Sequence, residues 1–210
     1  MKCVFFVVAA LCGLGALSLL HPLRAQVPAP QPFSADFTSH ATPQSTVTGK
    51  IYSLPPLLRM DASVNGGESR DYISSGAKLN YVLWPARQQY QDFHSDRDAD
   101  PAAKGTLAEN MFDPEHPCGP FPSCTKQGEE TIDGRLCEKW LMVSKYGSQT
   151  TYFDKKLLFP IRRTEASGIV WQLTNIVEAK PDASVFQVPA GYKKVLPLGG
   201  VMGGARGPGN

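Results

Sequence analysis

The chain has 210 residues and carries 21 basic and 19 acidic residues, which give a formal net charge of +2. A chain so close to neutral has no net field to draw in nucleic acid, and it contains no cluster of Lys and Arg with interleaved aromatic residues, so we expect no nucleic-acid partner. The length suits one domain with a sizeable core.

The N-terminal segment has the layout of a cleaved export signal. Lys2 precedes the uncharged apolar run Val4–Leu20, and Leu23–Ala25 then places a small residue just before Gln26. We therefore predict a signal peptide over residues 1–25 and a mature protein in the periplasm or outside the cell. The alternative is an uncleaved anchor, because the apolar run is only slightly shorter than the roughly 20 residues that span a bilayer. Membrane association is expected only in that case.

From Phe33 onward, apolar residues recur mainly with a period of two. Phe33, Ala35 and Phe37 alternate with polar residues, as is typical of a strand with one face on a core. The turn pairs Asp133-Gly134 and Ser167-Gly168 are short enough to join antiparallel neighbours. About ten strands at this spacing predict a mostly β fold, a curved antiparallel meander that forms a barrel or half-barrel. We expect it to be a single domain over residues 33–197.

Two segments interrupt this pattern. Residues 95–125 are polar and then rich in Pro and Gly, with room for one short helix over about residues 101–111. A break of this length in a compact sheet indicates a functional lid or a disordered insertion. Residues 198–210 are rich in Gly, and we expect a disordered tail because ordering so many glycines costs more entropy than the segment regains.

Three cysteines remain after the predicted cleavage. Cys118, Cys124 and Cys137 allow one disulfide and one free thiol. A Cys118–Cys124 bridge and a Cys124–Cys137 bridge would each stabilise the fold by about 2–4 kcal/mol, so energy does not choose between them. Geometry slightly favours Cys124–Cys137, because a strand and turn over residues 126–135 would bring position 124 back to within the roughly 5.5 Å Cα separation that a bridge needs.

The catalytic and metal-binding motifs in the sequence are incomplete. Asp96, Asp98 and Asp100 match the first ligands of a calcium loop, but Pro and Leu occupy the positions that require Gly and an acidic residue. The sequence has neither the C-x-x-C pair of many zinc sites nor the G-x-S-x-G turn of serine hydrolases. We therefore expect a protein that is not an enzyme, with no metal and no cofactor.

Aromatic residues are frequent on the predicted strands, and some would line a cavity if the sheet curls into a half-barrel. The segment Trp140–Val143 is apolar on both strand faces and must be covered on both sides, by protein or by a ligand. The basic pair Arg162-Arg163 would suit an anion, but a solvated pair at a strand edge is the simpler interpretation. The candidate ligand-binding residues of the cavity are Tyr81, Trp84, Trp140, Met142 and Trp171.

Several segments of the C-terminal half carry a family resemblance. They are Glu130–Trp140, Tyr152–Asp154, Leu157–Arg163 and Phe186–Tyr192. In this order and spacing they resemble the LolA-like superfamily of exported, outer-membrane lipoprotein-sorting-like proteins, in particular its small exported members. The resemblance implies a curved antiparallel sheet with a helix on its concave side and an apolar hollow between them that binds acyl chains. It adds a lipid or a lipoprotein to the expected partners.

These features together predict an exported, non-enzymatic binding protein for an apolar ligand. The ligand would be a lipid, an acyl chain or a hydrophobic segment of a partner. The alternative is a structural or interaction module of the cell envelope, with a packed core and no ligand.

Overall fold

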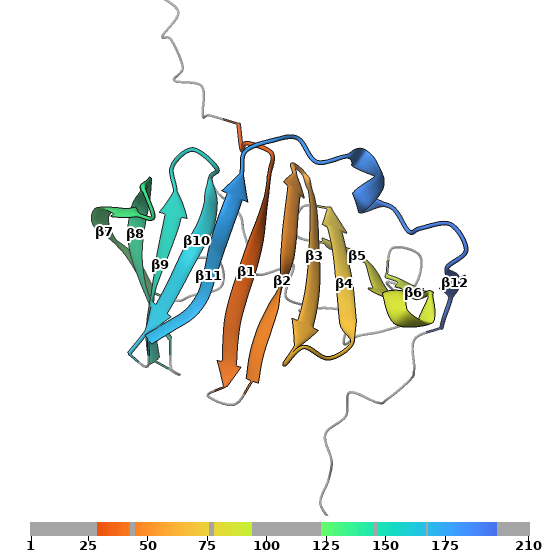
Figure 1. Cartoon of the computed structure of the whole chain (residues 1–210). Helices are drawn as coiled ribbons and strands as arrows, with labels where there is room; N and C mark the ends of the chain where they lie inside the picture. Colours follow the sequence, from red (N-terminus) through yellow and green to blue (C-terminus); the bar gives the residue numbers. More distant parts are fainter. Residues whose placement is uncertain are drawn as a thin grey trace, which may run out of the picture.

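The computed structural model describes residues 29–42, 45–75, 78–93, 123–144, 147–166 and 168–196. Within these ranges the chain forms one open, curved sheet of twelve strands with very little helix (Figure 1). The predicted mostly β fold is therefore confirmed. The predicted signal peptide, the short helix of the insertion and the tail lie outside the described residues. The predicted insertion is shorter at its end than expected, because Ser123–Thr125 already belong to a strand.

The strands follow one another along the chain in two sets. The first set is β1 (Phe33–Thr42), β2 (Ser45–Leu54), β3 (Leu57–Val64), β4 (Ser69–Ser75), β5 (Lys78–Trp84) and β6 (Gln89–Asp92). The second set is β7 (Ser123–Ile132), β8 (Arg135–Ser144), β9 (Gly147–Asp154), β10 (Phe159–Glu165) and β11 (Gly168–Val177), followed by the short β12 (Lys193–Lys194). Two single 3-10 turns complete the described elements, η1 (Pro85–Arg87) and η3 (Ala183–Phe186).

The order in the sheet is β12-β6-β5-β4-β3-β2-β1-β11-β10-β9-β8-β7. Strands β1 to β6 form one antiparallel meander, and β7 to β11 form a second. The two meanders join at the centre, where β1 pairs with β11 and Phe37 lies opposite Leu173. Strand β12 then pairs in parallel with β6 at the edge of the first meander.

The Asp133-Gly134 turn shows how the local sequence specifies a hairpin. Strand β7 ends at Ile132 and β8 begins at Arg135, so these two residues form the whole connection. Their φ angles are 49° and 79°, the left-handed conformation that Asp tolerates and Gly adopts freely. The hairpin predicted at this position is confirmed.

Strand β1 shows the predicted alternation. Phe33, Ala35 and Phe37 are at most 4% exposed, whereas Ser34 and Asp36 between them are half-buried. On the polar face, Asp36 forms an ion pair with Lys50 of β2 at 3.0 Å. One face of the central strands is therefore apolar, and the other faces solvent.

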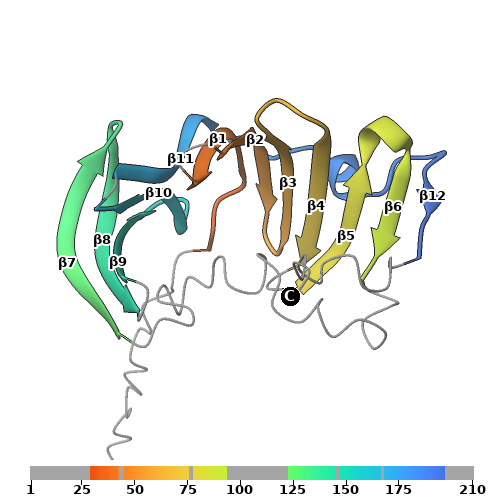
Figure 2. The ribbon, with the colours of Figure 1, turned by 90° about the horizontal axis from the view of Figure 1, so that it is seen from below.

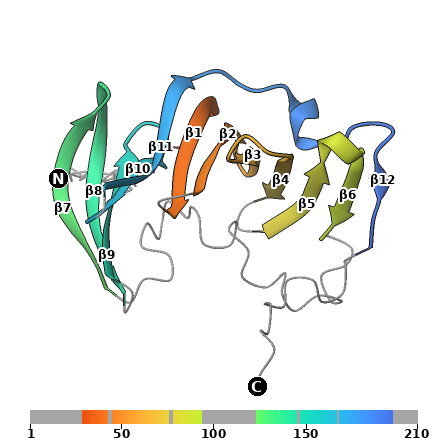
Figure 3. The ribbon, with the colours of Figure 1, turned by 60° about the horizontal axis from the view of Figure 1, so that its bottom comes forward.

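Strand pairing carries the apolar face across neighbouring strands. Ile51 of β2 lies opposite Met60 of β3, and Met60 lies opposite Tyr72 of β4. Figures 2 and 3 show that both ends of the sheet bend toward the same side, so that the sheet forms an arc with η3 on its outer side. Phe186 of η3 packs against Ile73, whose side chain points away from the face that Tyr72 occupies. The apolar face of β1 is therefore the inner, concave face.

Candidate functional site

The concave face has a buried floor and a half-exposed apolar layer. The floor includes Phe37 at 3% exposure, Ile51 at 1% and Leu173 at 2%. Apolar side chains that are only partly buried pack against it: Val47, Leu58, Met60, Tyr72 and Trp171. Among the described elements, no helix covers this face, so the helix that the family resemblance implies on the concave side does not come from the described part of the chain.

A row of paired residues crosses the concave face near one rim of the sheet. Trp140 of β8 lies opposite Thr151 of β9, Thr151 opposite Arg163 of β10, and Arg163 opposite Trp171 of β11. Because side chains two residues apart share a strand face, Trp171 points to the same side as Leu173 of the floor. The row therefore places Arg163 beside Trp171, on a face that also carries the Lys126–Glu138 ion pair next to Trp140.

The five candidate residues from the sequence do not form one surface. Trp140, Met142 and Trp171 belong to the concave face, and Trp84 joins that face by alternation at the far end of β5. Tyr81 lies on the convex face, where its ring stands edge-on to Tyr90 at 6.1 Å between centroids. A bulge between Ile73 and Ser74 shifts the pairing of β4 with β5, which the sequence pattern alone does not reveal.

The basic pair of β10 is split between the two faces. Arg162 donates to Asp133 at 3.0 Å on the convex side, as a surface pair would. Arg163 points to the concave side and is half-buried. The interpretation of the two residues as a solvated pair at a strand edge is wrong, because both are half-buried and β10 lies inside the sheet between β9 and β11. Arg163 was also not among the predicted ligand-binding residues. The alternation of β10 was the signal that could have separated them.

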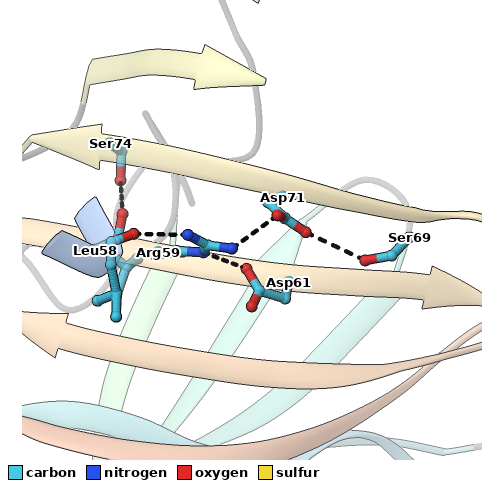
Figure 4. Close-up of polar contacts among 7 residues, drawn as sticks. Leu58, Arg59, Asp61, Ser69, Asp71 and Ser74 are labelled. Atoms are coloured by element: carbon cyan, nitrogen blue, oxygen red, sulfur yellow. Dashed lines mark hydrogen bonds and ion pairs between the residues drawn. The ribbon is translucent and has the colours of Figure 1, made fainter. Parts of the chain in front are cut away.

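A second polar group lies on the convex face, where the C-terminal segment crosses β3 and β4 (Figure 4). Arg59 donates to Asp61 at 2.5 Å, to Asp71 at 2.8 Å and to the carbonyl oxygen of Val185 at 2.7 Å. Ser69 also donates to Asp71, at 3.2 Å. One guanidinium thus joins two acidic residues and fixes η3 against the sheet.

Asp71 is the buried member of this group, with only 3% of its surface exposed. Burial and the nearby charge of Asp61 raise the pKa of Asp71 to about 6, although Arg59 acts in the opposite sense. The folded state therefore holds a proton on Asp71 more tightly than the unfolded chain does.

We expect the Asp71 carboxyl to titrate near pH 6. Its contribution to stability is complete below about pH 4 and is lost as the pH rises through about 6, because the folded pKa lies above the unfolded one. Carbon-13 NMR of the carboxyl group measures the titration directly. Asp71→Asn imitates the protonated acid, so the free energy of unfolding of this variant should decline less between pH 4 and pH 7. A titration of Asp71 near pH 4 would contradict the expectation.

A third polar group ties the end of β11 to the β8–β9 region. Arg135 donates to the buried carboxylate of Asp154 and forms an ion pair with Glu178 at 2.8 Å. The other oxygen of Asp154 accepts hydrogen bonds from the backbone N–H groups of Lys156 and Leu157, at 2.8 and 2.7 Å. The charged groups of this network take their hydrogen-bond partners from within the network. We therefore assign the network a structural role.

The predicted Cys124–Cys137 disulfide is wrong. Cys137 is a free thiol and is fully buried. In the β7–β8 pair, Cys124 lies opposite Met142, whereas Cys137 lies opposite Glu130. The offset of five residues from position 137 to position 142 separates the two cysteines by about 17 Å along the strand, far beyond the reach of a disulfide. The alternative Cys118–Cys124 bridge includes a residue outside the described ranges and stays a prediction.

The Cys137 thiol should be unreactive in the folded protein. Burial, together with the charge of Asp154, raises the pKa of Cys137 to about 11, so little thiolate forms at neutral pH. We expect N-ethylmaleimide to leave Cys137 unmodified in the native state and to modify it completely after unfolding without reductant. Peptide mapping under non-reducing conditions measures both outcomes, and a disulfide-linked peptide that contains Cys137 would contradict them.

The described part of the chain contains no group of three or more His, Cys, Asp or Glu residues arranged to hold a metal ion. None of its helices has both the length and the apolar character needed to cross a membrane.

No protein-family model matches the chain, and no curated protein matches it. An uncharacterized conserved protein from Thermus thermophilus is similar in structure, with a TM-score of 0.53 and 11% identity over 79% of this chain and 90% of that one. Two weaker likenesses are MucB, with a TM-score of 0.48 and 16% identity over 79% of this chain and 60% of MucB, and LprF from Mycobacterium bovis, with a TM-score of 0.38 and 14% identity over 77% and 89%. At these identities, the Thermus protein shows a shared fold and nothing more.

Proposed function

We propose that the protein is an exported, non-enzymatic binding protein whose concave face takes up an apolar ligand. The ligand is a lipid, an acyl chain or a hydrophobic segment of a partner. The observation that carries the proposal is the half-exposed apolar layer on the concave face, represented by Met60, Tyr72 and Trp171. Apolar surface of this kind is unfavourable in water, and when it is contiguous it marks a surface that something covers.

The sequence motifs support the same proposal. The segment Glu130–Trp140 builds the β7–β8 hairpin, and Leu157–Arg163 enters β10, so both motifs belong to the meander that supplies Trp140 and Arg163 to the concave face. Their resemblance to LolA-like proteins implies an acyl-binding hollow on this side of the sheet. The predicted signal over residues 1–25 supports export to the periplasm or to the outside of the cell.

Lipid extraction tests the proposal. We expect organic extracts of the protein, expressed with its N-terminal segment and purified under native conditions, to contain lipid by mass spectrometry in near-stoichiometric amount. Met60→Glu introduces a charge on the concave face and should remove most of this lipid. Thr48→Glu places the same charge on the exposed convex face of β2 and should leave the lipid content unchanged. A lipid-free extract from the folded wild-type protein would overturn the proposal.

A structural module with a packed core is the second candidate. The observation in its favour is the almost complete burial of Phe37, Ile51 and Leu173, which leaves only part of the concave face for a ligand. This candidate predicts a lipid-free extract and, for Met60→Glu, a loss of stability without any change in bound lipid.

A further inference from the structure

Arg163 is a cation for which the described part of the chain supplies no paired anion. Its side chain is half-buried on the concave face, and its buried Nε atom has no hydrogen-bond partner among the described residues. The described residues offer it no ion pair either. The charge that acts on it is that of exposed Glu165, two residues further along the same face, which attracts it without a hydrogen bond.

This arrangement is unfavourable unless something else binds the guanidinium. A buried hydrogen-bond donor without a partner destabilises the fold, and a charged donor does so more strongly. Burial accordingly lowers the pKa of Arg163, whereas the well-paired Arg59 and Arg135 have raised pKa values. Arg163 thus differs from the three other half-buried arginines of the described ranges, each of which has a carboxylate partner within the fold. The Nε atom of Arg162 also lacks a partner, but its guanidinium forms an ion pair with Asp133.

The position of Arg163 suits the polar end of an amphipathic ligand. It lies two residues before the end of β10, close to the rim of the sheet, and Trp171 lies opposite it on β11. Further from the rim, the same face continues with Leu173 and Phe37, which lie opposite each other at the central seam. A molecule held at Arg163 would therefore extend from a cationic end onto apolar surface.

We propose that Arg163 binds the carboxylate of a long-chain fatty acid whose hydrocarbon chain lies on the concave face. The inference rests on the proposed function and narrows it to one ligand class. The planar guanidinium presents two parallel N–H donors that match the two oxygens of a carboxylate. A monoanion also matches the charge of this one guanidinium, whereas a phosphate dianion would be repelled more strongly than a carboxylate by nearby Glu165.

Titration with cis-parinaric acid and its methyl ester tests this assignment, using the delipidated full-length protein. The two probes share one fluorescent chain and differ in the carboxylate. We expect Arg163→Gln to weaken binding of the acid about tenfold, which is the effect of losing one charge-assisted interaction, and to leave binding of the ester unchanged. Arg162→Gln is the matched control, because it removes the neighbouring cation from the convex face and should alter neither affinity. Arg163→Lys should recover part of the affinity for the acid.

The outcomes separate the two proposals. If neither probe binds the wild-type protein, both the proposed function and this inference fail. If both probes bind and Arg163→Gln changes neither affinity, the binding function stands and the role of Arg163 is overturned. An equal loss of affinity for the acid and for the ester would also overturn the role of Arg163, because such a loss would come from altered packing and not from the missing charge. Should Arg163→Gln not fold, Arg163→Met replaces it, with the same expected difference between acid and ester.

Discussion

Replacing Arg135 by Met should lower the free energy of unfolding by about 3–5 kcal/mol. The substitution removes the partner of Asp154, a carboxylate that is only 2% exposed and would be left buried with two backbone hydrogen bonds. It also removes one of the two cations that pair with Glu178 beyond the end of β11, where Lys156 is the other. Urea unfolding measures the loss, provided that the slope of the transition stays the same.

The control for this prediction is Arg87→Met. Arg87 contacts Glu68 through two hydrogen bonds of 2.9 and 2.8 Å, so its local geometry is as good, but the pair lies at the surface. Exposed pairs contribute at most about 1 kcal/mol, and we expect no more than that here. Combining Arg135→Met with Asp154→Asn should cost less than the sum of the two single changes, because no buried charge is left alone. Equal losses for Arg135→Met and Arg87→Met would contradict the structural role of the network.

Gly49→Ala should be comparably damaging, with a loss of about 3 kcal/mol or more. A methyl group on Gly49 would lie 1.7 Å from the backbone oxygen of Asp61 on β3 and 2.9 Å from the ring of Phe37 on β1. Neither neighbour can move without disturbing the pairing of β2 with the strands on both sides. We expect a large fall in the melting temperature, measured by circular dichroism.

Thr48→Ala is the matched control for Gly49→Ala. Thr48 is the preceding residue of the same strand and is exposed on the convex face, so its replacement should change stability by no more than about 0.5 kcal/mol. A stable Gly49→Ala variant with an unchanged melting temperature would show that β2 and β3 can separate locally without cost.

The local features of the fold were predictable from the sequence, because they depend on neighbouring residues. The alternation of Phe33, Ala35 and Phe37 predicts the inner face of β1, and Asp133-Gly134 predicts a hairpin. The pairing of β1 with β11 was not predictable, since no local signal specifies which distant strand completes the centre of a sheet.

The candidate site was harder to predict than the fold. Period-two alternation shows that adjacent residues such as Arg162 and Arg163 face opposite sides, but not which side is concave. Bulges add a second difficulty, because a single extra residue in β5 or β10 changes the faces of everything that follows. Tyr81 lies just beyond one such bulge, on the face away from Trp171. The disulfide prediction failed for a related reason, because the strand register places Cys124 and Cys137 at different levels of one hairpin.

The central seam between β1 and β11 also constrains how the chain reaches its folded state. The hydroxyl of Ser39 donates to the carbonyl oxygen of Val170, 131 residues further along the chain. Each meander can form from neighbouring hairpins, but the seam closes only after nearly the whole chain has been supplied, and contacts so distant in sequence form slowly. During synthesis, therefore, β1 exists for some time with an unpaired edge and an uncovered apolar face. A chain in that condition presents an open strand edge that other chains can pair with, and this edge is protected only once β11 has been made.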